Sequence, residues 1–147
     1  MKKYLLVILG IFFIVIPINA QYGVECVESD GQTMTFRVKG YGKNAKIDTQ
    51  DAEVNVIKAL MFAGIPNTQQ TVPMVKESEN ETIKNHKDFM NNFMDNGYKQ
   101  TITRSVLIQN FGKDENKQKS IVLNVTVNIP ALRNVLQREG IIRKFGL

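Results

Sequence analysis

One helix-forming segment limits the folds that this chain can adopt. At about 100° per residue, the apolar side chains of residues 48–64 cover more than half of the helix circumference, so this helix must be largely buried. Its alanines are small enough to let the backbone lie close to a neighbouring sheet. Asp48 or Thr49 is the expected N-cap, and Gly64 is the expected end of the helix.

Phe62 lies on the opposite side of this helix, in a narrow sector that otherwise carries charged and amide side chains. The next stretch, residues 65–80, contains two prolines and no regular apolar spacing, and loops of this length are often functional. Its apolar residues predict that it is held against the body of the domain. We expect this loop or a later helix to cover Phe62; if neither does, Phe62, Ile65 and Pro66 mark an interaction surface.

Two pairs of extended segments predict an antiparallel sheet of about four strands. Residues 22–41 contain two strand-like runs around an Asp30-Gly31 turn, and Asp-Gly between alternating runs is a hairpin signal. Residues 98–110 and 120–129 form a second predicted hairpin with a charged turn. The outward positions predict a face rich in hydroxyl and amide groups with some positive charge: Thr35, Arg37, Lys39, Thr101, Thr103, Asn124, Thr126 and Asn128.

Two further helices complete the predicted fold. In residues 81–97, His86, Phe89 and Phe93 share one apolar face, which is the pattern of a helix packed on a sheet. Residues 130–140 begin with a proline at a favourable first-turn position and end at a glycine.

The tail, residues 141–147, is expected either to add an edge strand or to dock on the sheet. If it is loose, its basic residues Arg143 and Lys144 form a short handle for a partner or a membrane surface.

The predicted fold class is therefore α+β. Helices packed on one face of an antiparallel sheet of about four strands form a two-layer sandwich, in the order β-β-α-α-β-β-α.

The N-terminal residues predict export. Lys2 and Lys3 precede an apolar run over residues 4–16, which is shorter than the roughly 20 residues that span a membrane. We expect residues 1–20 to be a signal peptide cleaved after Ala20, and residues 21–147 to form a single α+β domain without a transmembrane span. The expected location is the periplasm or cell surface of a Gram-negative bacterium.

The counts of cysteine and histidine exclude several kinds of chemistry. Cys26 is the only cysteine, so no disulfide forms within the chain, and we expect a buried thiol. His86 is the only histidine, which rules out a zinc site of ordinary composition, and a Cys26–His86 nucleophile pair has no supporting motif. We expect no catalytic residue, no metal and no cofactor.

The net charge is mildly basic. The formal value of +5 falls to +3 when Lys2 and Lys3 leave with the signal peptide. This charge favours an anionic envelope surface weakly, and we expect no binding to nucleic acid.

Three segments carry a resemblance to known families. The helix DAEVNVIKALMFAGIP, the later HKDFMNNFM and the closing VNIPALRNVLQREGI resemble an uncharacterised secreted family of Bacteroidetes. More distantly, the order of strand, alanine-bearing helix, hairpin and closing helix is similar to small envelope modules of the LPP20 and FlgT N-terminal types. The resemblance implies a periplasmic or cell-surface assembly or binding module, and it brings no catalytic residues.

The leading functional hypothesis is a non-enzymatic envelope module that binds a protein or polymer through the outer sheet face or the 65–80 loop. Arg37, Lys39, Arg143 and Lys144 are candidate interaction residues in addition to those of the loop. One alternative is a carrier with an apolar pocket near Phe89 and Phe93. Another is a small hydrolase that uses His86.

Overall fold

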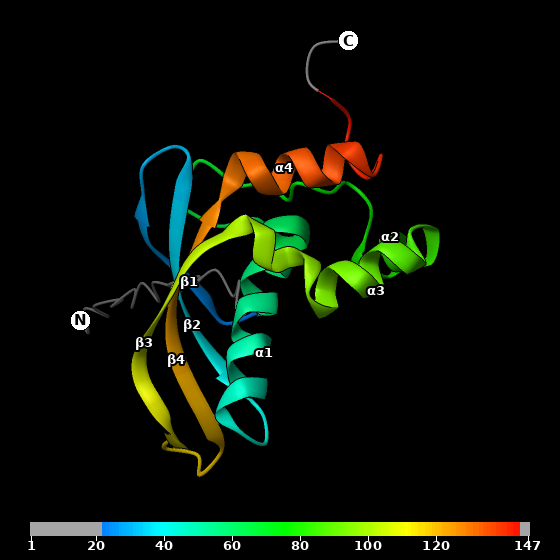
Figure 1. The fold of residues 1–147 in the computed structure, drawn as a ribbon. Helices are drawn as coiled ribbons and strands as arrows, with labels where there is room; N and C mark the ends of the chain where they lie inside the picture. The colour runs from blue at the N-terminus through cyan, green and yellow to red at the C-terminus, as the bar shows by residue number, and fades with distance from the viewer. Residues whose placement is uncertain (1–21, 145–147) are drawn as a thin grey trace, which may run out of the picture.

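The computed structural model describes residues 22–144 and shows a four-stranded antiparallel sheet with helices packed against it (Figure 1). The strands follow the order β1-β2-β4-β3 across the sheet, so β1 and β3 are its two edges. The predicted α+β class is thereby confirmed. The strands are β1 (Val24–Ser29), β2 (Thr33–Tyr41), β3 (Ile102–Lys113) and β4 (Lys119–Asn128).

Both predicted hairpins form. The Asp30 carboxylate accepts hydrogen bonds from the backbone N–H groups of Gln32 and Thr33 at 3.0 and 2.6 Å, which closes the turn between β1 and β2. Alternate residues of the two central strands enter the core, as the apolar pattern predicts, and Phe36 and Val125 are both fully buried.

The helical elements differ from the prediction at two points. The first helix is capped by the Asn44 side chain, which accepts from the Ile47 N–H at 3.1 Å, so the expected cap at Asp48 or Thr49 is wrong. The predicted helix 81–97 is broken at His86, whose backbone leaves helical geometry. The elements are α1 (Ala45–Lys58), η1 (Ala59–Ala63), α2 (Glu79–Asn85), α3 (Lys87–Asp95), η2 (Gly97–Thr101) and α4 (Ile129–Arg138).

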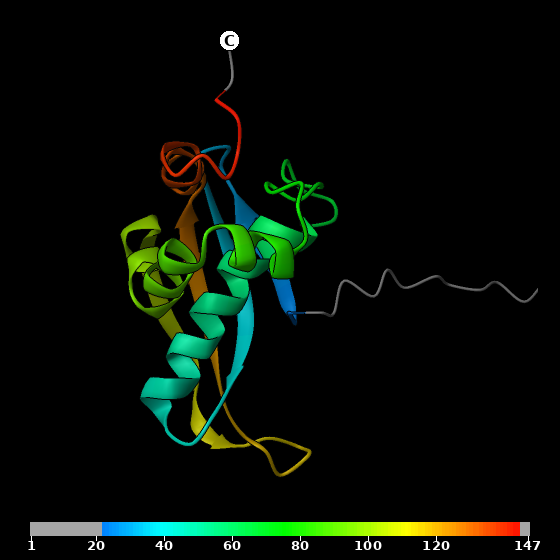
Figure 2. The same ribbon diagram turned by 90° about the vertical axis from the view of Figure 1, so that its right-hand side faces the viewer.

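The helix α1 packs along one face of the sheet against the central strands β2 and β4 (Figures 1 and 2). Gly40 of β2 makes this close approach possible: a Cβ atom there would lie 1.8 Å from the Asp48 carbonyl oxygen and 2.9 Å from the Ala52 side chain. Ala52, Val56 and Ile57 are consequently completely buried between helix and sheet.

The last turn of α1 widens into a π-helix, η1, in which the Gly64 N–H donates to the Ala59 carbonyl at 2.9 Å. Gly64 has φ 73°, a left-handed conformation that favours glycine, and it ends the helix as predicted. The following loop is held against the domain, as predicted, because the N–H groups of Met74 and Val75 donate to carbonyls of η1.

A polar network, buried at Tyr98 and Glu53 and partly exposed at Ser105, joins α1 to the second half of the fold. The Glu53 carboxylate accepts from the Tyr98 hydroxyl at 3.0 Å and from the Ser105 hydroxyl at 2.7 Å. Tyr98 is fully buried, and its pKa is raised first by burial and then by the neighbouring Glu53. The two hydrogen bonds compensate for placing a carboxylate inside the core.

The C-terminal residues dock without adding a strand. Pro130 lies in the first turn of α4 as predicted, and after Gly140 the side chains of Ile141 and Ile142 pack against the core. The edge-strand alternative therefore fails over residues 141–144, while residues 145–147 and the predicted signal peptide lie outside the described residues. None of the helices in the described range is long and apolar enough to cross a membrane.

The contact at Gly40 generates a stability prediction. Gly40→Ala should lower the free energy of unfolding by about 2–3 kcal/mol, because α1 must move away from β2 to admit the methyl group. Gly112→Ala is the matched control, since a Cβ atom at Gly112 of β3 meets nothing closer than 3.8 Å. Urea denaturation of both variants measures the difference; equal losses would contradict the proposed role of the close approach.

Candidate functional site

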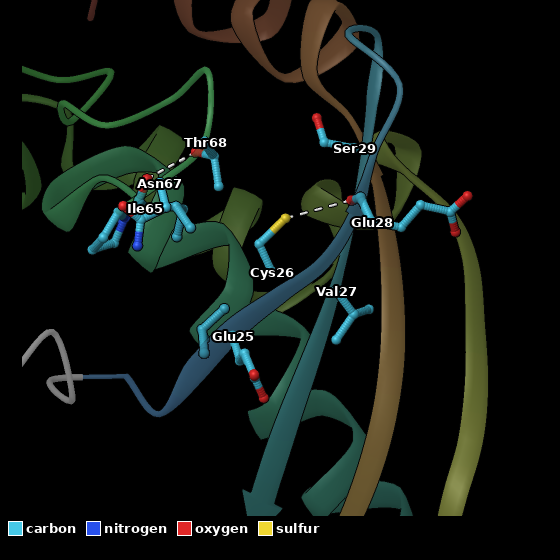
Figure 3. Close-up of a pocket in the computed structure, with 10 residues that line it drawn as sticks. Glu25, Cys26, Val27, Glu28, Ser29, Ile65, Asn67 and Thr68 are labelled. Atoms are coloured by element: carbon cyan, nitrogen blue, oxygen red, sulfur yellow. Dashed lines mark hydrogen bonds between the residues drawn. The ribbon is translucent and has the colours of Figure 1, made fainter.

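A groove runs along the free edge of β1, between this strand and the loop that follows η1 (Figure 3). Its volume is about 510 Å³, and its walls are β1 on one side and residues 65–68 on the other. Because β1 is an edge strand, its backbone is hydrogen-bonded to the sheet only on the side of β2. The groove therefore presents unpaired peptide groups beside side chains, an arrangement that can bind an extended peptide as an added strand.

The side chains of β1 divide between the two faces of the sheet. The register places Val24 and Cys26 on the helix-covered face, and Glu25 and Glu28 on the outer face. The pairing shifts between Cys26 and Glu28, so Val27 has no opposite residue on β2, and 41% of its surface is exposed. The groove therefore has an apolar inner side and an acidic outer side.

The facing wall is a loop fixed by its own hydrogen bonds. The Ile65 N–H donates to the Gln70 carbonyl at 2.7 Å, and the Thr68 hydroxyl donates to the Ile65 carbonyl at 2.8 Å (Figure 3). The Gln70 side chain accepts from the Arg133 guanidinium of α4 at 3.0 Å, which ties the loop to the last helix. The wall is thus held in position by the fold itself.

The start of β1 is anchored by a charged cluster. The Tyr22 hydroxyl donates to one oxygen of the Glu79 carboxylate at 2.8 Å, and the Lys58 ammonium pairs with the other at 2.7 Å. Burial and the adjacent carboxylate raise the pKa of Tyr22 to about 12. Burial opposes ionisation of Glu79, but the bonds from Lys58 and Tyr22 prevail and hold its pKa below the ordinary value.

Cys26 lies on β1 in the groove and is half-buried, and its sulfur is directed toward Glu28 (Figure 3). Its thiol donates to the Glu28 carbonyl at 3.4 Å, and burial raises its pKa despite this bond. The neutral thiol is therefore the dominant form at neutral pH, which makes Cys26 a packing group rather than an activated nucleophile.

The predicted interaction residues do not form one surface. Ile65 and Pro66 line the groove, but Ile65 is only 4% exposed and belongs to the core, which corrects its assignment to an open surface. Phe62 is half-buried on η1 and packs against the core, so it is covered only in part.

The basic candidates lie elsewhere. Arg37 and Lys39 are on the outer face of β2, where the Lys39 ammonium pairs with Asp114 at 3.5 Å. Arg143 and Lys144 are exposed after α4. Sequence reasoning missed the walls formed by β1 and by Asn67 and Thr68, because no local pattern identifies β1 as an edge strand.

The outer sheet face carries a second, polar hollow of about 500 Å³. The hydroxyl groups of Thr35 and Thr126 lie 2.9 Å apart there, and the side-chain oxygen of Asn124 is buried without a hydrogen-bond partner. Thr101 was predicted on this face, but it is buried: it ends η2, and its hydroxyl donates to the Tyr98 carbonyl at 2.6 Å.

The residues of the two alternative functions show ordinary packing. The rings of Phe89 and Phe93 stack with centroids 5.1 Å apart, and neither ring lines the two hollows described above. His86 is half-buried at the junction of α2 and α3, and within residues 22–144 its imidazole has no hydrogen-bond or ion-pair partner. In this same part of the chain, no group of three or more His, Cys, Asp or Glu side chains is placed to hold a metal ion.

Outside the groove, Asp48 is the most unusual charged group. It is fully buried near the start of α1, and neither carboxylate oxygen has a hydrogen-bond partner. Burial and the like charge of Asp51 raise its pKa, while Lys119 of β4 opposes this shift without cancelling it. A carboxyl whose native pKa is raised stabilises the fold below its unfolded pKa of about 4, and this contribution is lost as the pH rises.

Asp48→Asn should therefore raise the free energy of unfolding at pH 7, because the amide fills the same space without charge. The gain should shrink as the pH falls toward 4 and vanish below it, where the carboxyl is protonated in both states. Urea denaturation of the wild type and of Asp48→Asn across this pH range measures the gain. Asp88→Asn, at an exposed position of α3, is the control. A loss of stability at pH 7 would show instead that the Asp48 carboxylate is favourably paired.

Comparison with known proteins gives no assignment for this site. No protein-family model matches the chain, and neither a curated protein nor a solved structure shows significant similarity to it.

Proposed function

We propose that this chain is an exported, non-enzymatic binding module of the cell envelope that takes up an extended segment of a partner protein along β1. One observation carries the proposal: an edge strand with unpaired backbone groups lies beside a fixed loop, and the two enclose a groove of about 510 Å³. In strand addition, main-chain hydrogen bonds supply affinity and alternate side-chain contacts supply specificity.

The two sides of the groove indicate the chemistry of the segment. On the helix side, Val24 and Cys26 are half-buried and face the wall that contains Ile65 and Pro66, which suits apolar side chains. On the outer side, Glu25 and Glu28 have no ion-pair partner within residues 22–144, which suits Lys or Arg. A segment that alternates apolar and basic residues therefore fits both sides at once.

The groove suits a protein partner better than the outer sheet face does. The polar hollow on that face offers hydroxyl and amide groups, but Asp30 at its rim is already bonded to Gln32 and Thr33 of its own turn. The groove on β1 instead leaves backbone donors and acceptors unused within the described chain.

A synthetic peptide that alternates valine and lysine should bind the mature protein and slow hydrogen exchange of the β1 amides, residues 24–29. The double variant Glu25→Lys/Glu28→Lys should bind this peptide at least roughly fivefold more weakly, because like charges then face each other across the strands. Isothermal titration and exchange mass spectrometry measure the two effects.

The matched control is the double variant Asp88→Lys/Glu115→Lys, which makes the same change of charge at two exposed positions, one on α3 and one in the turn between β3 and β4. Its affinity for the peptide should equal that of the wild type. Binding that leaves the β1 amides unprotected, or that weakens equally in both variants, would contradict the proposed site.

The export component is supported by the leader, residues 1–20. When the full chain is expressed in a Gram-negative host, the protein should be recovered from the periplasmic fraction with Gln21 as its first residue. N-terminal sequencing tests this, and a cytoplasmic protein that retains Met1 would contradict it.

A further inference from the structure

The opposite edge of the sheet has the features that the β1 groove requires of its ligand. Three large apolar side chains of β3 are exposed: Leu107 by 48%, Ile108 by 49% and Phe111 by 37%. Residues 105–112 contain no charged residue, whereas Arg104 and Lys113 lie at either end of this stretch. A long edge strand with an uncharged central stretch and exposed apolar groups is prone to pair with another strand.

The inner face of β3 is only partly covered, because α1 packs chiefly against the central strands and reaches β3 through the bond from Ser105 to Glu53. The register places Leu107 opposite the buried Leu123, on the helix side of the sheet, and Arg104 opposite Thr126, on the outer side. The strand β3 therefore presents an apolar group on the face where the groove is apolar, and a basic group on the face where the groove is acidic.

We propose that β3 of one copy of this chain is the strand that docks in the β1 groove of a second copy. This inference rests on the proposed function, because it names the occupant of the same groove. Adjacent strands in the sheet are all antiparallel, so β1 and β3 run in opposite directions. A second copy placed edge to edge in the same orientation thus continues the antiparallel sheet, with its helices on the same side.

Charge complementarity selects this pairing over the symmetric ones. Glu25 and Glu28 of β1 would face Arg104 of the docking strand, and none of these three groups has an ion-pair partner within residues 22–144. Pairing β1 with β1 would bring acids together, and pairing β3 with β3 would bring bases together. The contact is therefore heterologous, and it propagates into a ring or an open series of copies.

Charge reversal tests the pairing in the mature chain. Glu28→Lys and Arg104→Glu should each reduce self-association about fivefold in sedimentation velocity, because each creates a like-charge contact. An equimolar mixture of the two variants should regain association, since the reversed groove of one accepts the reversed strand of the other. Failure of the mixture to associate more strongly than either variant alone would overturn the proposal.

The single cysteine provides a second test that does not depend on charge. Wild-type chain, with Cys26 in its groove, is mixed with a differently tagged Cys26→Ser variant that carries Ser105→Cys or Leu107→Cys, under a mild oxidant. A disulfide-linked heterodimer is expected for one or both positions, since a bridge requires Cα atoms roughly 4.4–6.8 Å apart. Lys84→Cys on the exposed face of α2 is the control.

Absence of a heterodimer from both β3 positions, or equal yields from the Lys84→Cys control, would overturn docking by β3. If the alternating peptide still binds the β1 groove of such a monomeric protein, the proposed function stands and the occupant is another protein. If the peptide also fails to bind, the groove itself is not a docking site.

Discussion

The close packing of α1 on the sheet is the contact on which the rest of the structure depends. Gly40 lets the backbone of α1 approach β2 at the Asp48 carbonyl, so the small and branched side chains of the helix reach the core. The chain has no disulfide and its described residues form no metal cluster, so buried apolar area must supply most of the stability. The buried bond from Tyr98 to Glu53 and the partly buried bond from Ser105 to Glu53 then fix the second hairpin and η2 relative to α1.

This packing also determines which surfaces are open. The helix α1 covers mainly the two central strands. The strand order leaves β1 and β3 with a neighbouring strand on one side only. The loop after η1 lies beside one edge and turns it into a groove, whereas the apolar side chains of Leu107 and Phe111 on the other edge are only partly covered. The two edges are complementary in charge and in apolar character, and the proposed docking of one copy on another rests on this complementarity.

Local sequence patterns predicted most of the helices and strands, but not which of them lie side by side in the fold. Alternation identified the inward faces of β2 and β4, and the Asp30-Gly31 turn identified the first hairpin. The break at His86 and the π-helical turn before Gly64 left no trace in the apolar spacing. The order β1-β2-β4-β3 depends on long-range pairing of β2 with β4, so the free edges and the groove could not be predicted from local sequence.

Hydrogen exchange of residues 21–147 over a range of protein concentrations tests edge-to-edge docking most directly. If copies dock edge to edge, the amides of β1 and β3 become protected together as concentration rises, while those of the central strands β2 and β4 exchange slowly throughout. Exchange at both edges that is independent of concentration, up to the highest concentration at which the protein stays in solution, would contradict it.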